Sequence, residues 1–197
     1  LTYTCYNANA ESTVTIDPKD TQTNIIINGG EFGTKTQDDK INAIDGIYAG
    51  GSGFMGLSLW TQRSAKPSRY GGNVYGQEGQ MVASLTIKRG TFYCKNGIFG
   101  GGRGTNYFFA KKKYGGKNAS DYKELGQTYG NVALNIPGGT FYCPIYGGGY
   151  GVADTVNLDN KKIETLSNMA RLYGKSTISI KGGTFYDNVY GGGDMAQ

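Results

Sequence analysis

Histidine is absent from this 197-residue chain, and its three cysteines lie far apart in the sequence. Zinc sites in proteins are built from Cys and His residues at short spacings such as C-x-x-C. The chain has no such pair, so we expect no metal site and no cofactor. Histidine is also the most frequent general acid or base in enzymes. Its absence argues against catalysis, and we predict that the protein is not an enzyme.

Long apolar runs are also missing. A membrane-spanning helix needs about 20 consecutive apolar residues, whereas the longest runs here, such as Ile25 to Ile27, are only a few residues long. We therefore expect no membrane span. The chain begins at Leu1 and carries no basic segment followed by an apolar one. This start is expected if a signal peptide has been removed or if the chain is cut from a longer protein.

Glycine and tyrosine are abundant, with 34 and 16 residues respectively. The glycines do not recur every third residue, which excludes a collagen helix. They stand instead at fixed distances from β-branched and aromatic residues, which disordered chains lack. This pattern predicts an ordered all-β protein with many turns.

An internal repeat accounts for these glycines. Four segments share an Ile, a Gly and a Phe at fixed positions, and each is followed by an Ile/Val-aromatic pair and a glycine cluster. The segments are 27–32 (INGGEF), 87–93 (IKRGTFY), 136–142 (IPGGTFY) and 180–186 (IKGGTFY), followed by 47–51 (IYAGG), 98–102 (IFGGG), 145–149 (IYGGG) and 189–193 (VYGGG). The shared glycines are spaced by 60, 49 and 44 residues. We divide the single domain, 1–197, into units 12–75, 76–128, 129–172 and 173–197.

Short strands precede the glycine corners, because apolar residues there alternate with polar ones. The alternation is visible in 12–16, 85–87, 132–136 and 176–180. Strands separated by glycine corners and repeated along the chain predict a parallel β-solenoid, a right-handed β-helix with loop inserts. At ~20–25 residues per coil, we expect two coils in each unit. A four-bladed β-propeller is the alternative, and the insert 156–172 is expected to hold a short helix around Ile163 and Met169.

The Ile-x-Gly-Gly-Thr-Phe-Tyr and Ile/Val-Tyr-Gly-Gly-Gly motifs resemble repeats in large, secreted or surface-anchored β-helix proteins of anaerobic, gut-type bacteria. The resemblance spans about residues 12 to 193 and implies an extracellular or cell-surface location and a structural or adhesive role. It carries over no functional residue. The first unit departs from the motif at Glu31, Gly33 and Ala49, which predicts a distorted or capping coil.

Two cysteines, Cys94 and Cys143, occupy the same place in successive units, directly after Thr-Phe-Tyr. In an oxidising compartment they could form a disulfide between neighbouring units. If two coils separate them, however, the gap is twice the ~4.8 Å strand spacing, which is too long for a disulfide. Two free thiols are the alternative. Cys5 lies before the repeats and is a candidate for a bridge to another subunit.

Other side chains are candidates for binding or modification. The repeat predicts one aromatic ladder, made by Tyr48, Phe99, Tyr146 and Tyr190. We interpret it as structural, and as a glycan platform or subunit interface if it faces outward. Asn118 lies in an Asn-x-Ser glycosylation pattern. The net charge of +5 arises largely from Lys111 to Lys113 and Lys117, which we interpret as a solvated loop, and we expect no nucleic-acid partner.

Three functions are compatible with these features. Residues 189–197 break off after a repeat motif without a polar cap, and an uncapped coil is a template for further strands. We therefore favour a structural protein that self-associates end to end into a homopolymer, forming a fibre, stalk or surface layer. A glycan-binding adhesin is the alternative. A β-helix polysaccharide-active enzyme is the third, and it would require a cleft with at least two facing carboxylates.

Overall fold

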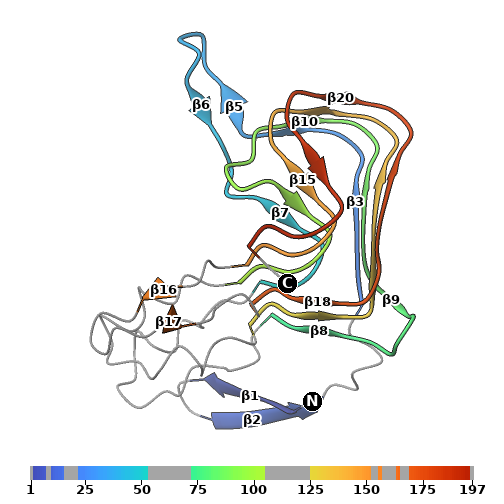
Figure 1. The fold of residues 1–197 in the computed structure, drawn as a ribbon. Coiled ribbons are helices and arrows are strands. Elements are labelled where there is room, and N and C mark those ends of the chain that lie inside the picture. The colour runs from blue at the N-terminus through green and yellow to red at the C-terminus, as the bar shows by residue number, and fades with distance from the viewer. Residues whose placement is uncertain are drawn as a thin grey trace.

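The fold is a stack of four coils, seen in cross-section in Figure 1. The computed structural model describes residues 2–7, 10–15, 22–52, 72–104, 125–151, 155–156, 163–164 and 169–195. These residues form strands and turns and contain no helix. Strands from successive repeat units pair in parallel, which confirms the prediction of a parallel β-solenoid.

Each coil contributes short strands to the same set of sheets. The first coil contains β3 (Thr23–Ile27), β4 (Glu31–Phe32) and β7 (Ile47–Tyr48); the second contains β8 (Val74–Tyr75), β9 (Met81–Ile87), β10 (Thr91–Phe92) and β11 (Ile98–Phe99); the third contains β12 (Thr128–Tyr129), β13 (Asn131–Ile136), β14 (Thr140–Phe141) and β15 (Ile145–Tyr146); the fourth contains β18 (Leu172–Tyr173), β19 (Ser176–Ile180), β20 (Thr184–Phe185) and β21 (Val189–Tyr190).

Three antiparallel hairpins are described besides the coils. They are β1 (Thr2–Asn7) with β2 (Ala10–Thr15), β5 (Thr34–Lys35) with β6 (Ile41–Asn42), and β16 (Thr155–Val156) with β17 (Ile163–Glu164). The predicted strand at 12–16 therefore belongs to β2 and pairs with β1. The first coil begins at β3, because that is the first strand to join a parallel sheet.

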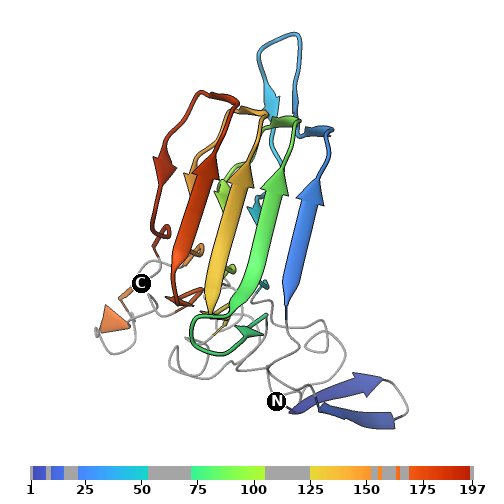
Figure 2. The same ribbon diagram turned by 90° about the vertical axis from the view of Figure 1, so that its right-hand side faces the viewer.

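Four parallel sheets line the faces of the solenoid. Their strand orders are β19-β13-β9-β3, β20-β14-β10-β4, β21-β15-β11-β7 and β18-β12-β8. The four long strands of the first of these sheets run side by side in Figure 2. Along the second sheet, equivalent residues of neighbouring strands are 60, 49 and 44 positions apart, as in Glu31–Thr91, Thr91–Thr140 and Thr140–Thr184. These are the spacings of the repeated glycine, so each unit pairs in register with the next.

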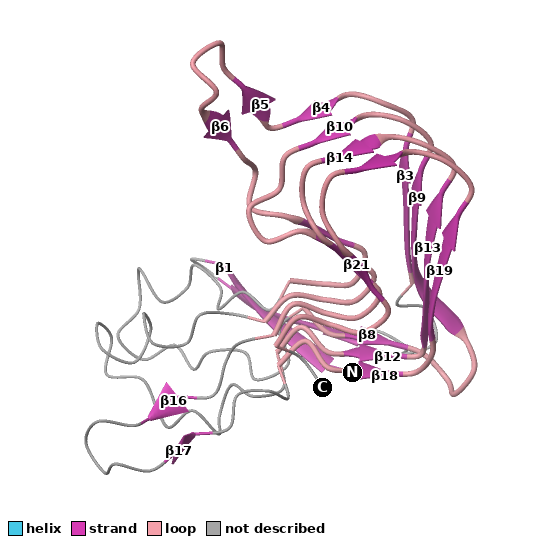
Figure 3. Ribbon diagram, turned by 45° about the horizontal axis from the view of Figure 1, so that its top comes forward, coloured by secondary structure: helices cyan, strands magenta, loops and turns pink. Residues whose placement is uncertain are grey.

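One repeat unit forms one coil, so the expectation of two coils per unit is wrong. Each turn of the chain makes strands in up to four sheets and then runs through a further parallel connection, in which Ser52, Arg103, Tyr150 and Asp194 bridge one another. This wide cross-section, visible in Figure 3, consumes the whole unit. The propeller alternative also fails, because strands of different units share each sheet, whereas a propeller blade is built within one unit.

The expected helix in 156–172 is also wrong where the structure describes this segment. Ile163 lies in β17, and Met169 and Ala170 form a turn in which Ala170 has a left-handed φ of 57°. Residues 157–162 and 165–168 lie outside the described residues, as do the Lys111 to Lys113 cluster, Lys117 and Asn118.

The first unit departs from the motif because a hairpin is inserted there. Glu31 and Phe32 keep the register of Thr91 and Phe92, and the chain then leaves the coil to form β5 and β6. Gly33 stands where the later units have Tyr, and it has a φ of +83°. A Cβ there would lie 2.7 Å from the Tyr93 carbonyl oxygen, so a larger residue could not make this exit.

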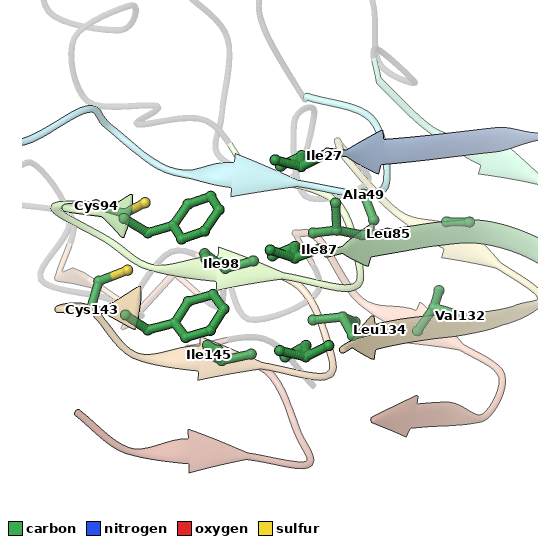
Figure 4. Packing of buried hydrophobic residues seen from close by; sticks show 14 residues of the cluster. Ile27, Ala49, Leu85, Ile87, Cys94, Ile98, Val132, Leu134, Cys143 and Ile145 are labelled. Carbon is green, nitrogen blue, oxygen red and sulfur yellow. The ribbon is translucent and has the colours of Figure 1, made fainter. Parts of the chain in front are cut away.

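The core lies between the sheets and consists of ladders of identical or similar side chains (Figure 4). The Phe ladder runs from Phe32 through Phe92 and Phe141 to Phe185, with ring centroids 4.9, 5.0 and 4.9 Å apart. Aliphatic ladders such as Ile98–Ile145 and Leu85–Leu134 pack beside it. Period-two alternation places these residues inward and their neighbours outward.

Candidate functional site: the exposed last coil

The fourth coil exposes apolar positions that the third coil buries. Ile136 and Ile145 have exposed fractions of 1% and 0%, whereas their register partners Ile180 and Val189 have 46% and 37%. The difference arises because each inner coil is covered on both sides, while β19, β20 and β21 are the last strands of their sheets. The last coil thus presents an apolar surface shaped like the inside of the stack.

Backbone hydrogen bonds join the third and fourth coils in two directions. In one sheet the amides of the fourth coil donate to the third, and in the next sheet the amides of the third coil donate to the fourth. The bonds are Thr184 N to Gly139 O at 2.8 Å, Tyr186 N to Phe141 O at 2.9 Å, Ile145 N to Asn188 O at 3.0 Å and Gly147 N to Tyr190 O at 2.8 Å.

The same repeat geometry leaves the far side of the fourth coil unpaired. The carbonyls of Gly183 and Phe185 correspond to the acceptors used in the third coil, and the amides of Val189 and Gly191 correspond to the donors. None of these four groups has a hydrogen-bond partner among the described residues. An unpaired parallel edge of this kind is a template for another strand.

The glycines that follow β15 and β21 also show that the fourth coil is uncovered on its far side. A Cβ on Gly147 would collide with the Gly191 carbonyl oxygen, and a Cβ on Gly148 would lie 2.6 Å from the Gly193 nitrogen. A Cβ on Gly191 or Gly192 would meet no atom within 4 Å. Gly148 of the third coil is therefore required by the coil that covers it, whereas Gly191 and Gly192 of the fourth coil face open space.

Aromatic ring faces are also concentrated at this end. In the Tyr93–Tyr142–Tyr186 ladder the centroids are 4.6 and 4.5 Å apart and the rings are nearly parallel. Each inner ring has both faces covered by its neighbours, so within a ladder only the first and last rings have a face that no other ladder ring covers. The last rings of the four ladders are Phe185, Tyr186, Tyr190 and Tyr173, all on the fourth coil.

The ladder predicted from the sequence stacks in register, with centroid distances of 5.2, 4.8 and 4.9 Å from Tyr48 through Phe99 and Tyr146 to Tyr190. It lies on the opposite side of its strands from the core residues Ile98 and Ile145. Tyr150 covers it, with its ring tilted against Phe99 at 5.2 Å, and Phe99 is fully buried. The ladder is thus a second set of packed side chains, separate from the main core.

A polar cluster that the sequence did not reveal joins the first two coils beside this ladder. Asp45 receives a salt bridge from Arg103 at 3.0 Å and hydrogen bonds from the Tyr48 hydroxyl and the Asn96 amide, each at 3.1 Å. Burial, with a smaller contribution from the Asp45 charge, raises the pKa of Tyr48 to about 12. Asp45 and Arg103 are 58 residues apart, and only the coil register brings them together.

Asp39 and Asp45 are engaged by different cations. Asp39, at the tip of the β5–β6 hairpin, pairs with Lys35 at 2.7 Å, while Asp45 pairs with Arg103. Lys35 lowers the pKa of Asp39 through this hydrogen bond and its charge. In the part of the chain that the structure describes, no cluster of three or more metal-ligating side chains occurs, and no helix is long and apolar enough to cross a membrane.

Cys94 and Cys143 are both buried free thiols, and they lie on adjacent coils. The Cys94 thiol hydrogen-bonds to the Cys143 sulfur. This bond is the main cause that raises the pKa of Cys94, and burial raises it further. The same bond lowers the pKa of Cys143. The two-coil gap that argued against a disulfide is therefore absent. Cys5 lies in β1, where its backbone faces Ser12 of β2, and its bridge to another subunit stays a prediction.

Comparison with known proteins gives no further guide, since no family model, curated protein or solved structure matches this chain.

Proposed function

We propose that this is a structural protein of the bacterial surface or exterior, which associates end to end by stacking its last coil on the first coil of another copy. The observation that carries the proposal is the exposure of Ile180 and Val189 beside an unpaired strand edge, when the same positions are buried in the coil before. Repeated stacking would extend the solenoid into a fibre, stalk or layer.

A second copy suits this edge because the first coil has the complementary edge. β4 and β7 lie at the opposite ends of the sheets that end in β20 and β21. Phe32 and Ile47 on these strands are half-buried, whereas their partners Phe92 and Ile98 in the second coil are fully buried. Stacking would place Phe185 against Phe32 and continue the Phe ladder across the junction.

Such a contact is head to tail, because it joins two different surfaces of the same chain. Contacts of this type form open filaments when the rotation between copies does not close a ring. All strands in the four sheets run parallel, so the next copy would keep the same strand direction and register. The assembly needs no other component.

The test uses Gly192, a glycine that faces open space. Gly192→Ala adds a methyl group that meets nothing within the isolated chain, but that would collide with a stacked coil as a Cβ on Gly148 would collide with Gly193. We expect the wild-type chain to form filaments with rising concentration in electron microscopy and sedimentation velocity, and the variant to stay monomeric with unchanged thermal unfolding.

Gly148→Ala is the matched control, because it makes the same change one coil earlier. Its Cβ would lie 2.6 Å from the Gly193 nitrogen, so it should lower the stability of the monomer itself. The proposal fails if the wild-type chain is monomeric at every concentration, or if the Gly192→Ala variant assembles as the wild type does.

Glycan binding is the second candidate, and the same end of the molecule favours it. Tyr186 and Tyr190 each have a ring face there that no other ring of their ladders covers, with exposed fractions of 64% and 44%. Tyrosine faces of this kind stack on sugar rings. A monomeric chain that binds glycans on an array, and loses binding in Tyr190→Ala, would favour the adhesin over the filament.

A further inference from the structure

The register of the sheet β20-β14-β10-β4, which carries the Phe ladder, fixes the positions of Cys94 and Cys143. Thr91 lies opposite Thr140 and Phe92 opposite Phe141, so the thiols that follow two residues later occupy equivalent places on adjacent coils. The two side chains lie one above the other in Figure 4. Neighbouring strands are about 4.8 Å apart, which falls within the 4.4–6.8 Å separation of Cα atoms that disulfides usually span.

The two thiols lie close enough to interact directly. The Cys94 thiol hydrogen-bonds to the Cys143 sulfur, and the Cys94 backbone amide donates to the same sulfur. Both side chains belong to the hydrophobic core cluster, with exposed fractions of 6% and 2%. On the outer sides, Cys94 pairs with Ile44 of the first coil and Cys143 faces the negative charge of Asp187. No other thiol of the described core competes for either cysteine.

We propose that Cys94 and Cys143 form a disulfide that links the second and third coils, by exchange with a small disulfide such as oxidised glutathione. The Cys143 thiolate attacks one sulfur of oxidised glutathione and releases the first glutathione thiolate, which takes up a proton. Cys94 loses its proton and attacks the Cys143 sulfur of the mixed disulfide, which releases the second glutathione. The two protein thiols together lose two electrons and form the disulfide, and one molecule of oxidised glutathione gains these electrons and becomes two thiols.

Burial controls when this exchange takes place. A glutathione molecule cannot reach thiols that are 6% and 2% exposed unless the coils separate. The disulfide therefore forms during folding, before the third coil closes on the second, and resists reduction afterwards. Its loop contains the 49-residue step from one unit to the next. Closing a loop of this size in the unfolded chain raises the midpoint of thermal unfolding by about 5–15 °C.

The experiment refolds the full chain in a glutathione redox buffer, in a Cys5→Ser background that leaves only the two core thiols. We expect no free thiol after denaturation, a Cys94–Cys143 linked peptide in a non-reducing digest, and a lower unfolding midpoint for the chain refolded with reductant instead. In Cys94→Ala and Cys143→Ala the reductant should have no effect on the midpoint.

Two results would overturn the proposal. One is two free thiols after refolding in the glutathione buffer. The other is a linked peptide whose formation lowers the unfolding midpoint, which would mean that the bond distorts the stack. Both readouts come from the wild-type core in the Cys5→Ser background, so they stand even if an alanine variant does not fold. They are also independent of filament formation, because they can be made on monomers.

Discussion

Gly139 turns the chain from β13, in the sheet β19-β13-β9-β3, into β14, in the sheet β20-β14-β10-β4. The equivalent glycines of the other coils make the same turn. The four glycines have φ values between 117° and 132°, a region that residues with a Cβ rarely adopt: Gly30, Gly90, Gly139 and Gly183. At Gly139 a Cβ would also lie 2.8 Å from the Cζ of Phe141. Backbone conformation and ring packing therefore both require glycine at this corner.

Gly139→Ala should lower the free energy of unfolding by about 2–4 kcal/mol, since backbone strain and a displaced Phe ring add together. Gly79→Ala is the matched comparison, because Gly79 also has a positive φ, of 78°, but a Cβ there meets nothing within 4 Å. It should cost only about 1 kcal/mol. Urea unfolding of the two variants measures the difference, and equal losses would show that ring packing contributes nothing at the corner.

Tyr48 offers a residue-scale test by pH. Its pKa is raised to about 12 in the folded protein, mainly by burial, against about 10 in an unfolded chain. The folded state therefore holds the proton more tightly, and the stability that this provides is present below pH 10 and is lost as the pH rises toward 12.

Stability of the wild-type chain should therefore fall more steeply between pH 10 and 12 than that of Tyr48→Phe, which has no proton to lose. Burial also raises the pKa of Tyr146 and Tyr150, so a residual slope is expected in the variant. Urea midpoints measured across this range give the difference between the two proteins. Identical slopes would mean that Tyr48 titrates as an ordinary exposed tyrosine.

At the scale of elements, each strand is only two residues long in three of the four sheets, and pairing between coils rather than strand length stabilises it. The Phe ladder supplies most of the apolar contact at one corner, because Phe141 is fully buried between Phe92 and Phe185. The last ring, Phe185, is only half-buried.

Phe141→Ala should accordingly cost about 3–5 kcal/mol, since it leaves a cavity between two rings that the backbone holds apart. Phe185→Ala makes the same change at the open end and should cost clearly less, because solvent already reaches that position. Chemical denaturation of both variants tests the ranking. A larger loss for Phe185→Ala would mean that the last coil is covered in solution.

Much of this arrangement could be predicted from the repeat. Fixed spacings between glycine, Phe and the Ile/Val-aromatic pair predict in-register ladders, because stacking places equal residues above one another. Alternation in 132–136 and 176–180 predicts β13 and β19 and the side of each that faces the core. The exposure of the fourth coil follows from the same logic, since no described unit lies beyond it to cover its motif residues.

The size of a coil could not be predicted in the same way. Spacing gives the length of the repeat but not the number of turns that the chain makes within it. Here the glycine-rich connection through Arg103 and Tyr150 adds a further bridged segment to every turn. The pairing of Asp45 with Arg103 depends on that segment too, and it has no counterpart in the other units, where Tyr150 and Asp194 replace the arginine. The repeat pattern therefore could not predict the Asp45–Arg103 pair.

For the molecule as a whole, stability should vary along the stack. A coil in the middle is held by two neighbours and a terminal coil by one, so a terminal coil can open by itself. The amides of Thr140 and Tyr142 bond to the second coil, and those of Thr184 and Tyr186 bond to the third.

In hydrogen exchange of the monomer, peptides covering β19 to β21 should therefore exchange faster than peptides covering β13 to β15. If filaments form, protection of β19 to β21 should rise to the level of the third coil, because these strands would gain a neighbour. Equal protection of both coils in a dilute monomer would show that the solenoid opens only as one unit.

The in-register steps of 60, 49 and 44 residues also constrain the order in which the protein can be made. Apart from β8, which pairs with the later strand β12, every strand in the second to fourth coils has a partner in the coil completed just before it. A chain emerging from the ribosome, or threaded through a secretion channel, could add one finished layer at a time onto a surface already in place. Growth of the molecule during synthesis and growth of a filament from finished subunits would then be the same physical step, first within one chain and later between chains.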